Sequence, residues 1–249
     1  MHLDILESFH DPELCKDLLA ALRRELDGEL RFMEVCGTHT VAIFQSGLRS
    51  VLPEEIVHLS GPGCPVCVTH EAEVNAFLDL AGTDGVIIAT FGDLMRVPGH
   101  GGRSLKQAQA DGARIKVVYA ASDALALARD NPDATVVFLG VGFETTAPTV
   151  AATVLMAEAQ GIENLRVLSF HKLVPPALEA LMADESTAID AFILPGHVSA
   201  VIGLAPYLPI AEKHHRPAAI TGFEPADVLQ ALVFLADRKS TRLNSSHYS

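Results

Sequence analysis

The feature that most constrains the fold is a phrase that recurs along the chain: an apolar run, a turn rich in glycine and proline, and an alanine-rich helical segment. Continuous apolar runs of strand length indicate strands that are buried on both faces, and their alternation with helices indicates parallel pairing. The sequence therefore predicts an α/β fold with mainly parallel sheets flanked by helices. The expected strands are residues 30–35, 55–60, 85–91, 114–120, 134–141, 165–170, 191–195 and 218–223.

The turns fall into two groups, and an alanine-rich connection at residues 122–133 separates them. This grouping predicts two similar lobes. We place an N-terminal helix in residues 1–28, a lobe with the cysteine turns in residues 29–121 and a second lobe in residues 122–237. In open parallel sheets, ligands bind outside the carboxyl ends of the strands. Because the turns lie at those ends, we expect them to face a cleft between the lobes.

The first helix has clear signals. Asp11 and Pro12 are typical of an N-cap and a first helical turn, and the leucines that follow recur every four residues, at Leu14, Leu18, Leu22 and Leu26. The pattern predicts an amphipathic helix over residues 11–27.

Charge and cysteine content narrow the possible partners and compartment. The chain has 18 Lys and Arg against 31 Asp and Glu, and this acidity argues against binding to nucleic-acid phosphates. Four cysteines in 249 residues are too few for a disulfide scaffold. The first residues also lack the basic and apolar segments of a signal peptide. We therefore expect a cytoplasmic protein without a nucleic-acid partner.

Residues 191–211 are long enough to span a bilayer and contain no charged side chain. Three prolines, two glycines and His197 interrupt the segment, and freed backbone groups are costly in lipid. The segment therefore predicts a buried strand, a Pro-Gly turn and a short helix, and no membrane span.

Three cysteines lie on glycine-rich turns. Cys36 follows an apolar run and precedes a helix, a position that favours the thiolate because the helix N-terminus offers N–H groups and partial positive charge. Cys64 and Cys67 form a Cys-x-x-Cys pair on the next such turn, which suits a reversible disulfide or joint metal ligation. With His39, the three thiols could instead form a Cys₃His zinc site, and thiolates also suit iron. Cys15 is expected to be a core residue of the first helix.

The remaining chemical signals are weaker. The run from Gly140 to Thr145 lacks the third glycine of a dinucleotide fingerprint, and no phosphate-binding loop with a lysine is present. Several other ionisable residues also fall on the turns: His39, His100, His171, His197, Asp93, Arg96, Glu144, Lys172 and Glu224. Each of these residues could equally make a structural cap or ion pair.

Seven blocks, in order along the chain, resemble the HypD family, whose members act in the maturation of nickel–iron hydrogenases. The blocks are MEVCGTHT (33–40), SGPGCPVCVT (60–69), ATFGDLMRVPG (89–99), GFETTAPT (142–149), FHKLVPPAL (170–178), PGHVSAVIG (195–203) and GFEPADVLQ (222–230). The resemblance covers essentially residues 1–236. Seven ordered blocks are much more specific than a single motif.

The resemblance implies a scaffold on which an iron centre with cyanide and carbon monoxide ligands is assembled. It implies a complex with the small chaperone HypC and cyanide delivery by HypE. By the family pattern, Cys36 is the essential iron-site thiol, Cys64 and Cys67 are a redox-active or iron-ligating dithiol, and His39 is a nearby functional residue. The alternatives are a thiol–disulfide oxidoreductase and a zinc-stabilised binding module.

The family also has a [4Fe–4S] cluster held by later cysteines, whereas this sequence has no cysteine after Cys67. Residues 238–249 differ in composition from the rest of the chain, and we expect them to be a non-native tail that is disordered or loosely packed. The apolar segment 201–210 is expected to take part in docking HypC; the alternative is ordinary core, which is favoured for the first half of the segment.

Overall fold

The structure is a computed structural model that describes residues 11–184 and 186–245. It contains two four-stranded sheets, and every pair of neighbouring strands is parallel. All eight expected strands are present, so the predicted α/β fold is confirmed. The strands are β1 (Leu30–Glu34), β2 (Ile56–Ser60), β3 (Val86–Thr90), β4 (Ile115–Val117), β5 (Thr135–Gly140), β6 (Leu165–Ser169), β7 (Ala191–Pro195) and β8 (Ala218–Thr221).

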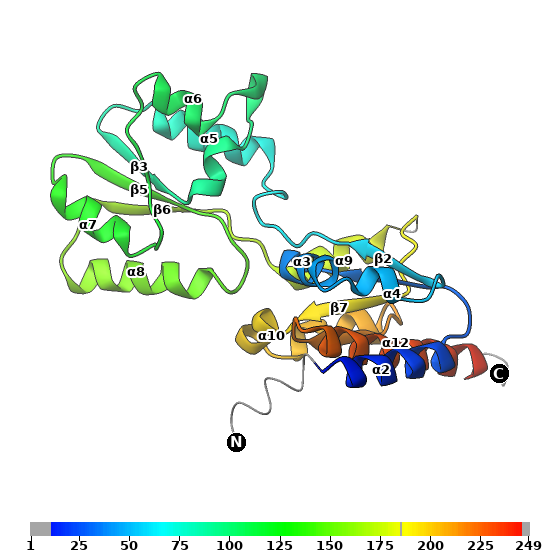
Figure 1. Cartoon of the computed structure of the whole chain (residues 1–249). Helices are drawn as coiled ribbons and strands as arrows, with labels where there is room; N and C mark the ends of the chain where they lie inside the picture. The colour runs from blue at the N-terminus through cyan, green and yellow to red at the C-terminus, as the bar shows by residue number, and fades with distance from the viewer. Residues whose placement is uncertain (1–10, 185, 246–249) are drawn as a thin grey trace. The chain divides into compact units, whose positions relative to one another are not determined.

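The chain folds into two compact units, each with one sheet. Unit 1 holds the described residues of Met1–Cys64 and Val174–Ser249, and unit 2 is Pro65–Leu173. In Figure 1, the blue N-terminal and the yellow-to-red C-terminal segments form unit 1, and the cyan and green middle segment forms unit 2. This division differs from the expected boundary after residue 121, because the sequence of unit 2 interrupts the sequence of unit 1 between its second strand, β2, and its third strand, β7.

Both units have the same strand order. Unit 1 has the order β2-β1-β7-β8 and unit 2 the order β4-β3-β5-β6. Numbered within its own unit, each sheet is therefore 2-1-3-4, the beginning of a doubly wound fold. The two similar lobes expected from the sequence are thus present. Since both units repeat the same strand–turn–helix phrase, the sequence pattern does not reveal where one interrupts the other.

Alternating strand residues explain how sheet 2, the sheet of unit 2, is covered. Ile87 and Phe138 point to one face, where they join a core with helices α7 (Asp123–Asp130) and α8 (Ala147–Ala159). Ile88 and Leu139 join a second core with α5 (Glu71–Ala81) and α6 (Leu105–Ala110). Figure 1 shows these helix pairs on opposite sides of the strands. The expected connection at 122–133 is thus mainly α7, a helix whose alanines pack in the core of unit 2.

In unit 1, Leu30, Phe32 and Ile193 pack with apolar residues of α2, α3, α4 and α12. The helices of this unit are α2 (Pro12–Glu25), α3 (Gly37–Gln45), α4 (Leu48–Val51), α9 (Val174–Ala183), α10 (Gly196–Ile202), α11 (Leu208–Glu212) and α12 (Pro225–Ser245). Helix α2 confirms the first predicted helix, and the Asp11 carboxylate accepts the N–H of Glu13 at 2.9 Å as its N-cap.

Residues 191–202 form the buried strand β7 and the short helix α10, which confirms these two elements; Pro195 ends the strand and Gly196 begins the helix, so the expected Pro-Gly turn does not separate them. None of the helices in the described part of the chain combines the length and apolarity that a bilayer crossing requires.

The C-terminal segment differs from expectation. Helix α12 continues to Ser245, and the ammonium of Lys239 donates to Asp190 Oδ2 at 2.9 Å and to the carbonyl of Glu29. The expectation of a loosely packed tail is therefore wrong at Lys239, where the side chain bonds to the residue before β1 and to the residue before β7. The rest of that expectation lies outside the described part of the chain, which omits the side chains of residues 240–245 and the whole of residues 246–249.

Candidate functional site

Four of the resemblance blocks follow the four strands of sheet 1, the sheet of unit 1. The turn Cys36-Gly-Thr-His39 follows β1, and Gly61-Pro-Gly-Cys64 follows β2. His197 follows β7 by two residues, and Gly222-Phe223 follow β8. Because the strands are parallel, their carboxyl ends lie along one edge of the sheet. We call these four turns the sheet 1 turn edge.

Cys36 lies where β1 passes into α3. It is the N-cap of this nine-residue helix, with extended backbone at φ −149° and ψ 123° and a side chain 7% exposed. Its carbonyl accepts the N–H of Thr40 at 3.2 Å, and its thiol makes no capping hydrogen bond. The thiol is therefore held at the partly positive end of a helix, as the sequence predicts.

The Gly61–Cys64 turn is in close contact with the Cys36 turn. The N–H of Gly61 donates to the carbonyl of Glu34 at 2.8 Å, and the N–H of Gly37 donates to the carbonyl of Gly63 at 3.3 Å. A Cβ at Gly63 would lie 2.3 Å from the Gly37 nitrogen and 2.8 Å from the Cys36 Cα, so only glycine fits there. Cys64 follows Gly63 directly, which brings its backbone close to Cys36.

Cys67 belongs to unit 2, on a turn at residues 65–68 that leads toward α5. The N–H of Thr69 donates to the carbonyl of Val66 at 3.2 Å, and its hydroxyl donates to the carbonyl of Pro65 at 3.0 Å. The side chain of Cys67 is exposed and that of Cys64 is half-buried. Over residues 11–184 and 186–245, no three His, Cys, Asp or Glu side chains are grouped as metal ligands. A three-cysteine iron site therefore stays a prediction.

His39 is fully buried, and the carbonyl of Gly222 fixes its orientation. The distance from His39 Nε2 to that oxygen is 2.7 Å, and a carbonyl only accepts, so Nε2 carries the proton. Nδ1 then holds a lone pair, and within the described residues it is buried without a hydrogen-bond partner. Burial is the largest cause that lowers the pKa of His39, and it outweighs the opposing effects of Gly222 and Glu34.

Aromatic packing links His39 to the turns after β7 and β8. The ring of Phe223 lies 4.6 Å from the His39 ring and 5.2 Å from the His197 ring, between centroids. The structure thus brings Cys36, His39, Cys64 and His197 to the same turn edge.

Two residues at this edge were not singled out from the sequence. Glu34 ends β1 and is fully buried, and His58 stacks on Phe32 across the β1–β2 pair, with ring centroids 5.0 Å apart. The distance from His58 Nε2 to Glu34 Oε1 is 3.5 Å. The available signal was a polar residue inside or at the end of an apolar strand, which is unusual unless the residue has a buried partner.

Unit 2 has its own turn edge, formed by the blocks that follow β3, β5 and β6. The N–H of Lys172 donates to the carbonyl of Gly142 at 2.9 Å, and a Cβ at Gly140 would lie 2.9 Å from His171 Cε1. The hydroxyl of Ser169 and Nδ1 of His171 are 2.8 Å apart, and burial lowers the pKa of His171. Lys172 also pairs with Glu73 in the first turn of α5. Residues from the GFETT and FHK blocks therefore meet within unit 2.

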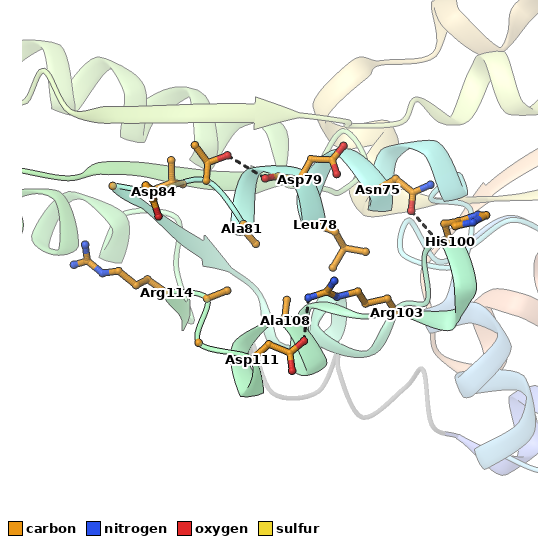
Figure 2. A pocket seen from close by; sticks show the side chains of 16 residues that line it. Asn75, Leu78, Asp79, Ala81, Asp84, His100, Arg103, Ala108, Asp111 and Arg114 are labelled. Atoms are coloured by element: carbon orange, nitrogen blue, oxygen red, sulfur yellow. Dashed lines mark hydrogen bonds and ion pairs between the residues drawn. The ribbon is translucent and has the colours of Figure 1, made fainter.

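A polar cavity of about 800 Å³ lies at the opposite end of sheet 2. Figure 2 shows Arg103 paired with Asp111 and the carboxamide of Asn75 bonded at His100. Gly85 and Arg114 also line it, just before β3 and β4, which places the cavity at the amino ends of these strands. It contains no cysteine, so His100 belongs with this cavity rather than with the cysteine turns.

Comparison with known proteins identifies the family. Residues 13–246 match the family model described as HypD, hydrogenase formation hypA family. The chain is 44% identical over 241 residues to the hydrogenase maturation factor HypD of Escherichia coli K12, covering 94% of this chain and 64% of that protein. It is 46% identical over 234 residues to HypD of Rhodobacter capsulatus, covering 91% and 62%. It thus spans less than two thirds of the length of these relatives. On this evidence, the chain belongs to the HypD family.

Proposed function

We propose that the chain acts in nickel–iron hydrogenase maturation, as a scaffold on which the iron fragment Fe(CN)₂CO is assembled. The observation that carries the proposal is the contact of Gly63 with the Cys36 turn, because it holds two thiol-bearing segments together at one sheet edge. Iron is the cargo of this reaction. The family and the names of its relatives as hydrogenase maturation factors support this assignment.

The proposed roles follow from the chemistry of each side chain. Cys36 binds iron as a thiolate, which the N-terminus of α3 favours. Cys64 and Cys67 supply a dithiol that either ligates the same iron or closes reversibly to a disulfide. His39 offers the Nδ1 lone pair as a hydrogen-bond acceptor, since Nε2 is committed to Gly222. The partners would be a HypC-type chaperone that shares the iron and a HypE-type donor of cyanide.

The donor set of this sequence does not fit a [4Fe–4S] cluster. Such a cluster is held by four cysteine thiolates. This chain has four cysteines in all, and Cys15 packs against the apolar core of unit 1. The remaining three cysteines are too few to hold such a cluster.

The test is anaerobic co-purification with a HypC-type chaperone from cells supplied with iron, followed by metal analysis and infrared spectroscopy. We expect iron, with cyanide and carbonyl stretching bands that disappear in Cys36→Ala. Cys15→Ala is the matched control, because Cys15 belongs to none of the four turns and packs against the apolar core of unit 1, and it should keep the bands. Stoichiometric zinc, or iron-free protein with full disulfide reductase activity, would contradict the proposal.

A further inference from the structure

A fully buried carboxylate lies directly beneath the Cys36 turn. Glu34 Oε2 accepts the backbone N–H of Cys36 at 3.0 Å, and Oε1 accepts the hydroxyl of Thr40 at 2.5 Å. One side chain therefore holds both the N-cap of α3 and the next turn of the helix.

The bond to Cys36 is unusual for its position. The N–H of an N-cap residue has no partner within its own helix, so it normally faces water or a nearby side chain. Here Cys36 is buried, and a buried N–H without a hydrogen-bond acceptor is destabilising. Glu34 removes that cost while fixing the peptide from which the Cys36 side chain projects.

The backbone of Glu34 is itself held by the strands on both sides of β1 and by Gly61. It pairs with Ser60 in β2 and with Ile193 in β7, and its carbonyl accepts the N–H of Gly61. The side chain of Glu34 also lies near the His58 ring, with His58 Nε2 3.5 Å from Glu34 Oε1. A carboxylate anchored in this way transmits the rigidity of the sheet to the turn that carries the thiol.

We propose that Glu34 is the positioning residue of the Cys36 thiol. This inference rests on the proposed function, in which Cys36 binds the iron. Glu34 acts through the Cys36 peptide and does not itself bind the cargo. A buried carboxylate is expensive to keep unless its hydrogen bonds are made, and here both oxygens accept hydrogen bonds from residues at the start of α3.

The first experiment measures hydrogen exchange at the Cys36 amide in the unaltered chain. We expect exchange at least about 100-fold slower than in an unstructured peptide, because this buried N–H is hydrogen-bonded to the Glu34 carboxylate. Exchange at the peptide rate would overturn the proposal, and this result would not depend on whether the chain binds iron.

The second experiment compares three variants for iron loading and for the cyanide and carbonyl bands. Glu34→Leu removes both acceptors, and we expect at least a tenfold loss of iron loading in a chain that still folds, with a thermal midpoint below that of the parent. Glu34→Gln keeps the length of the side chain, so its amide oxygen can still accept from Cys36 while its NH₂ donates to the Thr40 oxygen. Thr40→Val keeps the Cys36 bond. We expect both of these variants to retain most of the loading.

Full loading in Glu34→Leu would overturn the proposal. So would loss of loading in a folded Glu34→Gln, because charge rather than position would then be the important property. If Cys36→Ala also keeps the bands, the proposed function fails, and the exchange measurement still decides whether Glu34 orders the turn.

Discussion

The contact between the two thiol-bearing turns makes a sharp prediction for Gly63→Ala. The added Cβ would lie 2.3 Å from the Gly37 nitrogen and 2.6 Å from the Cys36 carbonyl carbon, and both are backbone atoms that cannot rotate away. Ordinary contact requires a separation of about 1 Å more than this. Overpacking of this kind costs about 1–3 kcal/mol. The Gly37 to Gly63 hydrogen bond, worth about 0.5–1.5 kcal/mol, would be lost as well.

We therefore expect Gly63→Ala to lower the free energy of unfolding by about 2–4 kcal/mol in urea denaturation. It should also lower iron loading at least tenfold, since the Cys64 backbone moves away from Cys36. Gly37→Ala is the matched control on the other side of the contact. Its Cβ would meet only the Gly63 carbonyl oxygen, at an ordinary 3.6 Å, and alanine is the better helix former. Equal stability of the two variants would refute the reasoning from this contact.

Three further predictions concern other parts of unit 1. Lys239→Ala should lower the free energy of unfolding in urea by about 1–2 kcal/mol, because it removes a half-buried charged hydrogen bond to Asp190. An unchanged urea midpoint would show that this end of α12 does not contribute to stability. Because burial lowers the pKa of His39, its contribution to stability is present above the ordinary histidine pKa of 6.5 and is lost as pH falls below that value. The parent should therefore lose thermal midpoint between pH 6.5 and 5, and His39→Gln should lose less. An identical pH profile of the two proteins would contradict this. Leu204→Asp should weaken binding of a HypC-type partner with little change in stability, since the Leu204 side chain is 61% exposed. Tyr207 in the same segment is 3% exposed, so its substitution would mainly test the core. Unchanged affinity of Leu204→Asp in calorimetry would exclude Leu204 from the interface.

The strands could be predicted from sequence because each one is a local pattern. Helices cover both faces of sheet 2, so neighbouring residues such as Ile87 and Ile88 are buried although they point to opposite faces. Its central strands are therefore continuously apolar in sequence. The division into units could not be predicted in the same way. Residues 122–133 are alanine-rich and therefore look like a connection. In the structure their alanines are core residues, because α7 packs closely on sheet 2 and leaves room only for small side chains.

The turns of the candidate site were likewise visible as glycine-rich segments, and Cys36, His39 and Cys64 lie where parallel pairing puts them. The contacts beneath them are of two kinds. Glu34 accepts from Cys36 and Thr40, which are close to it in sequence, but these bonds form only where β1 passes into α3. His58 faces Glu34 because Phe32 is its partner in the β1–β2 pair, and that register is a tertiary property that neighbours in sequence do not encode.

The shared strand order explains why the blocks lie where they do. In a 2-1-3-4 sheet the order reverses between the first and third strands, and the loops after these strands leave toward opposite faces and open a crevice. In unit 1 these are the loops after β1 and β7, which carry Cys36, His39 and His197. In unit 2 they are the loops after β3 and β5, which carry Asp93 and Glu144 but no cysteine. The two positions of the same topological origin therefore differ in chemistry, and the thiol and imidazole groups suited to soft metal ions are concentrated at the one in unit 1.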